Sequence, residues 1–223
     1  MPPETQAQVV LVEDHPMFRE QLAHLINKQP DMVVCAETDN AADGLEAIKR
    51  EGISLAIIDI TLKNSSGLEL LKDIRAHGIR VPVLLLSMHP ESLYAERAMR
   101  AGANGYITKV EASTKVMNAI RQVLAGEIYL DPKFMKRVVS QILVSPKNGS
   151  PQPVERLTDR ELAVFELIGE GKTTREIGSR LRVSVATVET YRARIKDKLG
   201  LDNASQLHSK ASQWLHERHG LTN

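Results

Sequence analysis

The stretch "LAIIDITLKNSSGLEL", residues 55–70, decides the expected fold of the first half of the chain. It begins with the run "LAIID" (55–59), which is short, rich in branched residues and apolar on both faces, as a strand in a covered parallel sheet must be. The run ends on an acid, Asp59, and a helix-like stretch follows near 67–77. The stretch therefore predicts a strand–helix unit with Asp59 at the carboxyl end of its strand.

The same alternation of strand-like and helix-like stretches recurs through the first 126 residues. The other strand-like runs are "VVLVE" (9–13), "MVVCA" (32–36), "VPVLLLS" (81–87) and "NGYIT" (104–108). Helix-like stretches follow them near 17–28, 41–51, 91–101 and 112–125. Five such units predict an α/β fold of the flavodoxin-like kind, with a doubly wound five-stranded parallel sheet. In these sheets the chemistry lies beyond the carboxyl ends of the strands.

Composition narrows the class of protein. A chain of 223 residues is long enough for two domains. It has no run of about 18 apolar residues, so no membrane span is expected. Its polar start "MPPETQAQ" does not resemble a secretory signal. The one cysteine, Cys35, is expected to lie buried in a strand and not in a disulfide, and a cytoplasmic location is expected.

Charged and polar residues gather at the predicted strand ends. Glu13 and Asp14 close the first strand, Asp59 closes the third, Ser87 ends the fourth and Lys109 follows the fifth. Three converging acids repel one another unless a cation joins them, and carboxylate oxygens favour Mg²⁺. A hydroxyl and an ammonium group opposite the acids would hold the oxygens of an anion. A phosphoryl group on Asp59 fits this arrangement.

Residues 7–126 resemble the receiver domain of two-component response regulators. The matching residues are the pair Glu13-Asp14, the strand-end Asp59, Ser87 in "LLLSMH" and Lys109 at the end of "GYITK". The resemblance implies that Asp59 accepts a phosphoryl group from a sensor histidine kinase. It also implies Mg²⁺ ligands, which are Glu13, Asp14, Asp59 and the backbone carbonyl of Thr61.

The resemblance also implies a conformational switch. Tyr106 occupies the aromatic switch position and is expected to rotate inward as Ser87 moves toward the phosphate. One departure concerns Val110, because many receivers have a proline after the lysine, which leaves the reach of Lys109 open. His15, beside the acidic pair, is expected to lie on the loop surface.

A joint separates this domain from a second one. Residues 145–153, "SPKNGSPQP", have a linker composition, and "DPKFMKRVVSQIL" (131–143) predicts an added helix with Asp131 as N-cap. We therefore expect a receiver over 7–126, a linker with a possible extra helix over 127–153, and a second domain over 154–220.

The second domain is expected to be all-α. Thr158 with Glu161, and Thr173 with Glu176, form two capping boxes, and Ser184 caps a third helix that ends at Gly200. A fourth helix is expected from Asn203 and Gln206 to about 217. Short helices with tight joints predict a small helix-turn-helix domain. On its fourth helix, Leu207, Ala211 and Leu215 suit either the domain core or a dimer contact.

Residues 157–201 resemble the LuxR-type helix-turn-helix, and the two resemblances together point to the NarL/FixJ class of response regulators. The landmarks include "LTDRE", Gly171, "EI" at 176–177 and "KLG" at 198–200. The segment 172–199 holds 8 basic residues against 3 acidic ones, which favours a polyanion partner. The resemblance implies double-stranded promoter DNA as that partner and a homodimer as the active form.

Helical spacing divides the faces of the third helix. Val188, Tyr191, Ile195 and Leu199 form an inward apolar stripe, which turns the opposite face toward the major groove. That outer face and the neighbouring helix N-terminus supply the predicted DNA-binding residues, which are Lys172, Thr173, Thr174, Ser184, Thr187, Glu189, Thr190, Arg192, Ala193, Arg194 and Lys196.

Glu189 is an acid on this basic helix, and three interpretations stay open. Its carboxylate can accept a hydrogen bond from the amino group of a cytosine, it can pair with Arg192 three residues on, or it can serve only the helix-terminal field.

The sequence as a whole predicts a phosphorylation-switched transcription regulator and not a dedicated enzyme. One alternative is a phosphorelay or protein-interaction module whose helical domain does not bind DNA. Another is a receiver that works unphosphorylated, with a vestigial acid cluster.

Overall fold

The computed structural model describes residues 6–62, 65–88, 91–131 and 153–220. The chain divides into two compact units, Met1–Val144 and Ser145–Asn223, each described here by itself. Apart from their end residues Asp131 and Pro153, the predicted helix at 131–143 and the linker at 145–153 lie outside the described residues. Within the described residues, no helix is long and apolar enough to cross a membrane.

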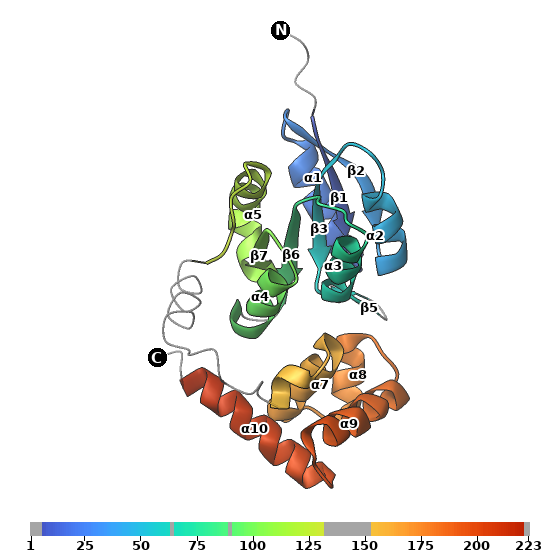
Figure 1. Ribbon diagram of the computed structural model, residues 1–223, viewed down its shortest axis with the longest axis vertical. Helices are drawn as coiled ribbons and strands as arrows, with labels where there is room; N and C mark the ends of the chain where they lie inside the picture. The colour runs from blue at the N-terminus through green and yellow to red at the C-terminus, as the bar shows by residue number, and fades with distance from the viewer. Residues whose placement is uncertain (1–5, 63–64, 89–90, 132–152, 221–223) are drawn as a thin grey trace. The chain divides into compact units, whose positions relative to one another are not determined.

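The first unit is built on a parallel sheet of five strands, as predicted (Figure 1). In sequence order these strands are β1 (Ala7–Val12), β2 (Met32–Thr38), β3 (Ile53–Asp59), β6 (Val83–Ser87) and β7 (Gly105–Thr108). Their spatial order is β2-β1-β3-β6-β7. Strand β2 is added on one side of β1, and β3, β6 and β7 are added on the other side. This change of side is the topological switch point at which doubly wound folds place their sites.

Helices cover both faces of this sheet. The helices are α1 (Pro16–Asn27), α2 (Ala41–Ile48), α3 (Gly67–Ala76), α4 (Glu91–Arg100) and α5 (Lys109–Leu124). Helices α1 and α5 bury their apolar residues against one side of the strands, on Val9, Leu11, Ile57, Leu86 and their neighbours. The alternate strand residues, such as Val10, Val12 and Ile58, are equally buried, so both faces of the central strands are covered.

Several element boundaries differ by a few residues from the sequence prediction, and two of them have clear local reasons. The strand expected at 81–87 begins at Val83, because Pro82 has no N–H to donate to a ladder; its carbonyl still accepts from the Ala56 N–H at 2.9 Å. The helix expected at 112–125 begins at Lys109, because the Thr108 hydroxyl accepts a hydrogen bond from the Glu111 N–H and caps it there.

The expected burial of Cys35 is wrong. Cys35 is exposed, although its thiol donates to the Val9 carbonyl at 3.4 Å. Two features explain this. Strand β2 is an edge strand, and its pairing with β1 shifts register so that Val9 faces Val34 whereas Val10 faces Ala36. Cys35 is therefore the extra residue of a bulge at the sheet edge.

A short antiparallel pair that the sequence analysis did not predict shapes the loop after β3. Strands β4 (Thr61–Leu62) and β5 (Ser65–Ser66) pair, and the Ser66 hydroxyl caps α3 by accepting from the Leu68 N–H. At Gly67, the first residue of α3, a Cβ would collide with the backbone carbonyl of Asp59. Glycine here allows α3 to begin directly against the strand end that carries Asp59.

After α5 the chain returns to the sheet. Tyr129 forms an isolated bridge with Gly105 of β7. The Tyr106 N–H donates to the Tyr129 carbonyl at 2.9 Å, and the Tyr129 N–H donates to the Asn104 carbonyl at 3.0 Å. The segment that leads out of this unit is therefore hydrogen-bonded to the backbone of Tyr106.

The second unit is helical. It consists of the 3-10 turn η1 (Pro153–Arg156) and the helices α7 (Asp159–Gly169), α8 (Thr174–Leu181), α9 (Val185–Leu199) and α10 (Ala204–Gly220). Both predicted capping boxes are present, at the starts of α7 and α8, and the Ser184 hydroxyl caps α9, which ends at Gly200 in the left-handed conformation. A three-residue turn joins α8 to α9, with Arg182 also left-handed. This is a helix-turn-helix.

Helix α10 belongs to the core of the second unit. Leu207 and Ala211 are fully buried, and the ring of Trp214 lies 5.5 Å from that of Phe165 on α7. Leu215 is half-buried. Of the two roles open for Leu207 and Ala211, the structure therefore shows core packing.

Candidate functional site

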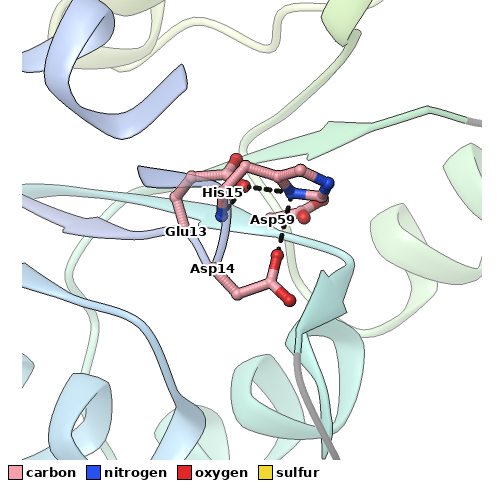
Figure 2. Close-up of side chains that lie close together, drawn as sticks. All are labelled: Glu13, Asp14, His15 and Asp59. Carbon is pink, nitrogen blue, oxygen red and sulfur yellow. Dashed lines mark hydrogen bonds and ion pairs between the residues drawn. The ribbon is translucent and has the colours of Figure 1, made fainter. Parts of the chain in front are cut away.

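The predicted acids meet at the carboxyl edge of the sheet. Glu13 and Asp14 follow β1, and Asp59 ends β3, whose neighbour Ile58 pairs with Val12 of β1. All three carboxylates are buried, and Asp59 is fully inaccessible. Each offers an oxygen within 4.8 Å of the others and of a ring nitrogen of His15 (Figure 2). Parallel strands that end together thus form an acid pocket, which we define as Glu13, Asp14 and Asp59.

Lys109 closes the pocket from the start of α5. Its Nζ lies 2.8 Å from Asp59 Oδ2 and 2.8 Å from Glu13 Oε1, and it is itself buried. The described residues contain no cis peptide bond, so the bond to Val110 is trans, and Lys109 reaches the acids from that geometry. The question that Val110 raised about the reach of Lys109 is answered: the lysine contacts both acids.

Asp59 is electrostatically strained in this pocket. Burial first, and then the charge of Glu13, raise the pKa of Asp59 to about 7 against the opposing effect of Lys109. Lys109 binds only its Oδ2, and Oδ1 is buried with no hydrogen-bond partner among the described residues. A cluster of hard oxygens with one buried oxygen unsatisfied fits a divalent cation such as Mg²⁺. The residues present therefore suit a metal-assisted acceptor site.

The raised pKa of Asp59 predicts that the free energy of unfolding of the first unit depends on pH. Between about pH 4 and pH 7 the folded state holds a proton that the unfolded chain releases, so without divalent ions the first unit should lose stability as the pH rises through this window. An Asp59→Asn variant removes this dependence. We expect it to exceed wild type by about 2–4 kcal/mol at pH 8, and by much less at pH 4.

Urea unfolding in EDTA, followed by circular dichroism, measures this difference. The single tryptophan, Trp214, reports the second unit separately by its fluorescence. Asp73→Asn, an exposed acid on α3, is the matched control and should behave as wild type at both pH values. A stability difference between Asp59→Asn and wild type that is the same at pH 4 and pH 8 would contradict the assignment.

Ser87 and Tyr106 lie on the two strands of the sheet that follow β3 in spatial order, and Thr61 lies just beyond Asp59. Ser87 follows Leu86, which pairs with Asp59, and it is fully buried. Tyr106 lies on the neighbouring strand β7 opposite Leu85, and its side chain is also fully buried. Thr61 begins β4 two residues after Asp59, and its backbone N–H contributes to lowering the pKa of that carboxyl. The Tyr106 side chain therefore packs in the interior of the unit.

His15 contacts the acidic pair in addition to lying in the loop after β1. Its ring nitrogen Nδ1 lies 2.9 Å from Glu13 Oε1 and 2.9 Å from Asp14 Oδ1 (Figure 2). The backbone N–H of His15 also donates to Glu13 Oε1 at 3.0 Å. His15 lies in the loop before α1 with its side chain 43% exposed, as expected, but the turn from β1 into α1 also folds its ring over the two preceding carboxylates. Its position next to the acidic pair was the only available signal.

The predicted DNA-binding residues lie on α8, α9 and their N-terminal caps, and none of them is buried. On α9, Val188 and Ile195 are buried and Tyr191 and Leu199 half-buried, which confirms the inward stripe. The exposed members are Thr173, Ser184, Glu189, Thr190, Ala193 and Arg194, and the half-buried members are Lys172, Thr174, Thr187, Arg192 and Lys196. Two of these hydroxyl groups are already engaged with each other, since Ser184 Oγ lies 2.8 Å from Thr187 Oγ1.

Glu189 takes part in a polar triangle that joins the two helices. Its Oε1 accepts from Thr174 Oγ1 at 3.0 Å and from Arg192 Nη1 at 3.3 Å, while Arg192 Nη1 also donates to Thr174 Oγ1 at 2.6 Å. Of the three interpretations of Glu189, the pairing with Arg192 is therefore present in the structure. Thr174, 15 residues away in sequence, is a third member that spacing alone did not indicate.

A buried cluster of carboxylates at the switch point of a parallel sheet, followed by a helix-turn-helix, is the arrangement expected of phosphorylation-controlled DNA-binding regulators. Comparisons with known families agree. The response regulator receiver domain matches residues 9–121, and the luxR family of bacterial regulatory proteins matches residues 155–211. The chain therefore belongs to the LuxR-type response regulators, which are transcription regulators.

Known relatives align along almost the whole chain. The transcriptional regulatory protein UhpA of Escherichia coli is 31% identical over 89% of this chain and 94% of its own length. LiaR of Bacillus subtilis is 30% identical, over 95% of this chain and 97% of its own. A LuxR-family response regulator from Aurantimonas sp. has a TM-score of 0.57 at 29% identity, covering 62% of this chain and 99% of that chain.

A second solved structure shares only the fold. RcsB of Salmonella enterica serovar Typhimurium, solved on promoter DNA, has a TM-score of 0.57 at 20% identity, covering 93% of this chain and 99% of that one.

Proposed function

We propose that Asp59 accepts a phosphoryl group from a sensor histidine kinase and that this modification controls DNA binding by the second unit. The observation that carries the proposal is the unsatisfied oxygen Asp59 Oδ1, buried beside a lysine that binds the other oxygen. In the reaction, Oδ1 attacks phosphorus, the bond from phosphorus to the kinase histidine nitrogen breaks, and an acyl phosphate forms. The phosphodonor supplies the energy, so this chain acts as a regulator and not as a dedicated enzyme.

The residues of the pocket have separate roles in this proposal. Glu13, Asp14, Asp59 and the backbone carbonyl of Thr61 would hold Mg²⁺, which supplies positive charge next to the phosphoryl oxygens when bound. Lys109 already lies against Asp59 and would pair with a phosphoryl oxygen. Ser87, at the end of the adjacent strand, would donate its hydroxyl to another oxygen.

The path to the second unit begins at Ser87 and Tyr106. Movement of Ser87 toward the phosphoryl group would free space for the ring of Tyr106, whose side chain is fully buried. Because the Tyr106 N–H is bonded to the Tyr129 carbonyl, a shift of β7 reaches the start of the joint. The switch would then release the DNA-binding unit, promote a homodimer that reads two half-sites, or do both.

DNA binding is proposed for the outer face of α9 and the N-terminus of α8. The exposed residues of α9 read base edges, while Lys172 and Thr173 present a helix N-terminus to phosphate. The alternative of a protein-binding helical unit has no comparable support, since 172–199 carries 8 basic residues against 3 acidic ones. Promoter DNA is therefore the proposed partner.

A salt titration tests this DNA proposal. The full chain, treated with beryllofluoride and Mg²⁺, should bind random duplex DNA with an affinity that falls at least about tenfold between 50 and 200 mM salt, because cations released from the DNA backbone drive the binding. Fluorescence anisotropy of a labelled duplex measures it. Arg194→Ala should lower the slope by about one released ion. Absence of binding at low salt, with and without beryllofluoride, would support the protein-interaction alternative.

A further inference from the structure

We propose that His15 is a nitrogen ligand of the acid pocket and that it shifts the metal preference of the pocket from Mg²⁺ toward divalent ions of the first transition series, for which Mn²⁺ is the probe. The inference rests on the proposed function, since it assumes a divalent ion among Glu13, Asp14 and Asp59. It adds a nitrogen ligand to the oxygen ligands of the proposed function, and with it a metal preference that oxygen ligands alone would not give.

The spacing between His15 and the acids suits a shared ion. Neighbouring ligands of an octahedral ion, with bonds of about 2.1 Å, lie about 3 Å apart. His15 Nδ1 lies 2.9 Å from Glu13 Oε1 and 2.9 Å from Asp14 Oδ1. Figure 2 shows the ring turned so that this nitrogen faces both carboxylates. An ion that binds the carboxylate oxygens would therefore have Nδ1 within reach after only a small adjustment of the ring.

A second observation is independent of these contacts. Asp59 is fully buried, and its Oδ1 has no hydrogen-bond partner among the described residues. Lys109 binds Asp59 Oδ2 and Glu13 Oε1 with a single ammonium group. This one positive charge balances only part of the negative charge of the three acids. A buried carboxylate oxygen without a hydrogen-bond partner is costly, and a bound cation in the pocket would offset part of this cost. His15 and Oδ1 belong to the same 4.8 Å cluster.

Ligand chemistry predicts the direction of the preference. Mg²⁺ and Mn²⁺ both favour oxygen ligands, but Mg²⁺ keeps its waters, whereas Mn²⁺ belongs to the transition series, whose ions accept an imidazole nitrogen more readily. A pocket of three carboxylates discriminates weakly between Mg²⁺ and Mn²⁺. Addition of one imidazole strengthens the binding of Mn²⁺ without strengthening that of Mg²⁺. The side chain of His15 is 43% exposed, which leaves room for its ring to rotate toward the ion or away from it.

The test uses the full chain with Mn²⁺ and Mg²⁺ as the probes. Pulsed EPR of bound Mn²⁺ should show nitrogen hyperfine coupling in wild type, changed in the expected way when the histidines are labelled with ¹⁵N. The coupling should vanish in His15→Ala and in His15→Asn, which keeps a hydrogen-bonding group near the acids. Calorimetry should show Mn²⁺ affinity reduced at least about tenfold in both variants, with Mg²⁺ affinity changed much less.

His24→Ala, an exposed histidine in the last turn of α1, is the matched control and should keep both the coupling and the affinities. Mn²⁺ binding without nitrogen coupling, and with equal affinity in the His15 variants, would overturn the role of His15 and leave the acid pocket intact. Failure of wild type to bind either ion would overturn the metal site in the proposed function itself. The two failures are therefore distinguishable.

Discussion

The Asp59→Asn variant is expected to lose the response to beryllofluoride entirely, whereas wild type should gain about tenfold or more in affinity for operator DNA. Beryllofluoride with Mg²⁺ mimics a phosphoryl group only when it can bond to a carboxylate oxygen. The amide of asparagine lacks the negative charge that this bond requires, although it fills the same space. A coupling between two sites is worth about 1–3 kcal/mol, which corresponds to roughly 5–150-fold in affinity.

The measurement is anisotropy of a labelled operator duplex, selected from random DNA, with the full chain in the presence and absence of beryllofluoride. Size-exclusion elution on the same samples reports a dimer. Asp73→Asn again serves as the control, since it makes the same chemical change on an exposed turn of α3. If Asp59→Asn and wild type responded alike, the receiver would work without phosphorylation, and the acid cluster would be vestigial.

The acid pocket was predictable from the sequence because of where its residues lie along the strands. Each acid lies at the end of an apolar run, and parallel strands bring such ends to one edge whatever the detailed packing. Lys109 followed from the same rule, although its reach depended on the Thr108 cap that starts α5 at residue 109. His15 did not follow, because its role depends on which way the turn after β1 folds the ring.

The error at Cys35 has a different origin. The run "MVVCA" reads as a buried strand, but burial depends on the neighbours of a strand in the sheet. Strand β2 lies at the edge, and a bulge places Cys35 outside the regular pairing. Neither strand order nor register irregularity can be read from local composition. The helical unit was easier, because caps and apolar stripes are local signals, and all of its helix starts were close to those predicted.

The choice among the three interpretations of Glu189 also needed the structure. Spacing on one helix reveals the pair with Arg192, but not Thr174 on the preceding helix. In the triangle, Thr174 and Glu189 together hold the guanidinium group of Arg192, and the side chain of this arginine is only 21% exposed. A long flexible side chain held in this way loses less entropy when it contacts DNA. This geometry favours positioning of Arg192 as the main role of Glu189.

We therefore expect Glu189→Ala to weaken binding to all duplexes by a similar factor, about three- to tenfold, without a change in the preferred base at any operator position. Loss of the carboxylate frees the side chain of Arg192. The contact proposed for this arginine is with a DNA phosphate, and such contacts do not depend on the base sequence. Thr174→Val should give a similar uniform loss. The double variant should lose less than the sum of the two, because both act through the same arginine.

The measurement is a set of dissociation constants on the selected operator, on its single-base variants and on random DNA, at one salt concentration. Arg180→Ala, which removes an exposed arginine that pairs with Glu170, is a control for general loss of helix charge. If Glu189→Ala instead changed preference at one position by about 1–3 kcal/mol, Glu189 would read a cytosine directly. In that case Thr174→Val would leave the preference intact, because the threonine supports the arginine and does not read the base. The pattern across the two variants, and not the size of either loss, thus decides what an acid does on a DNA-binding helix.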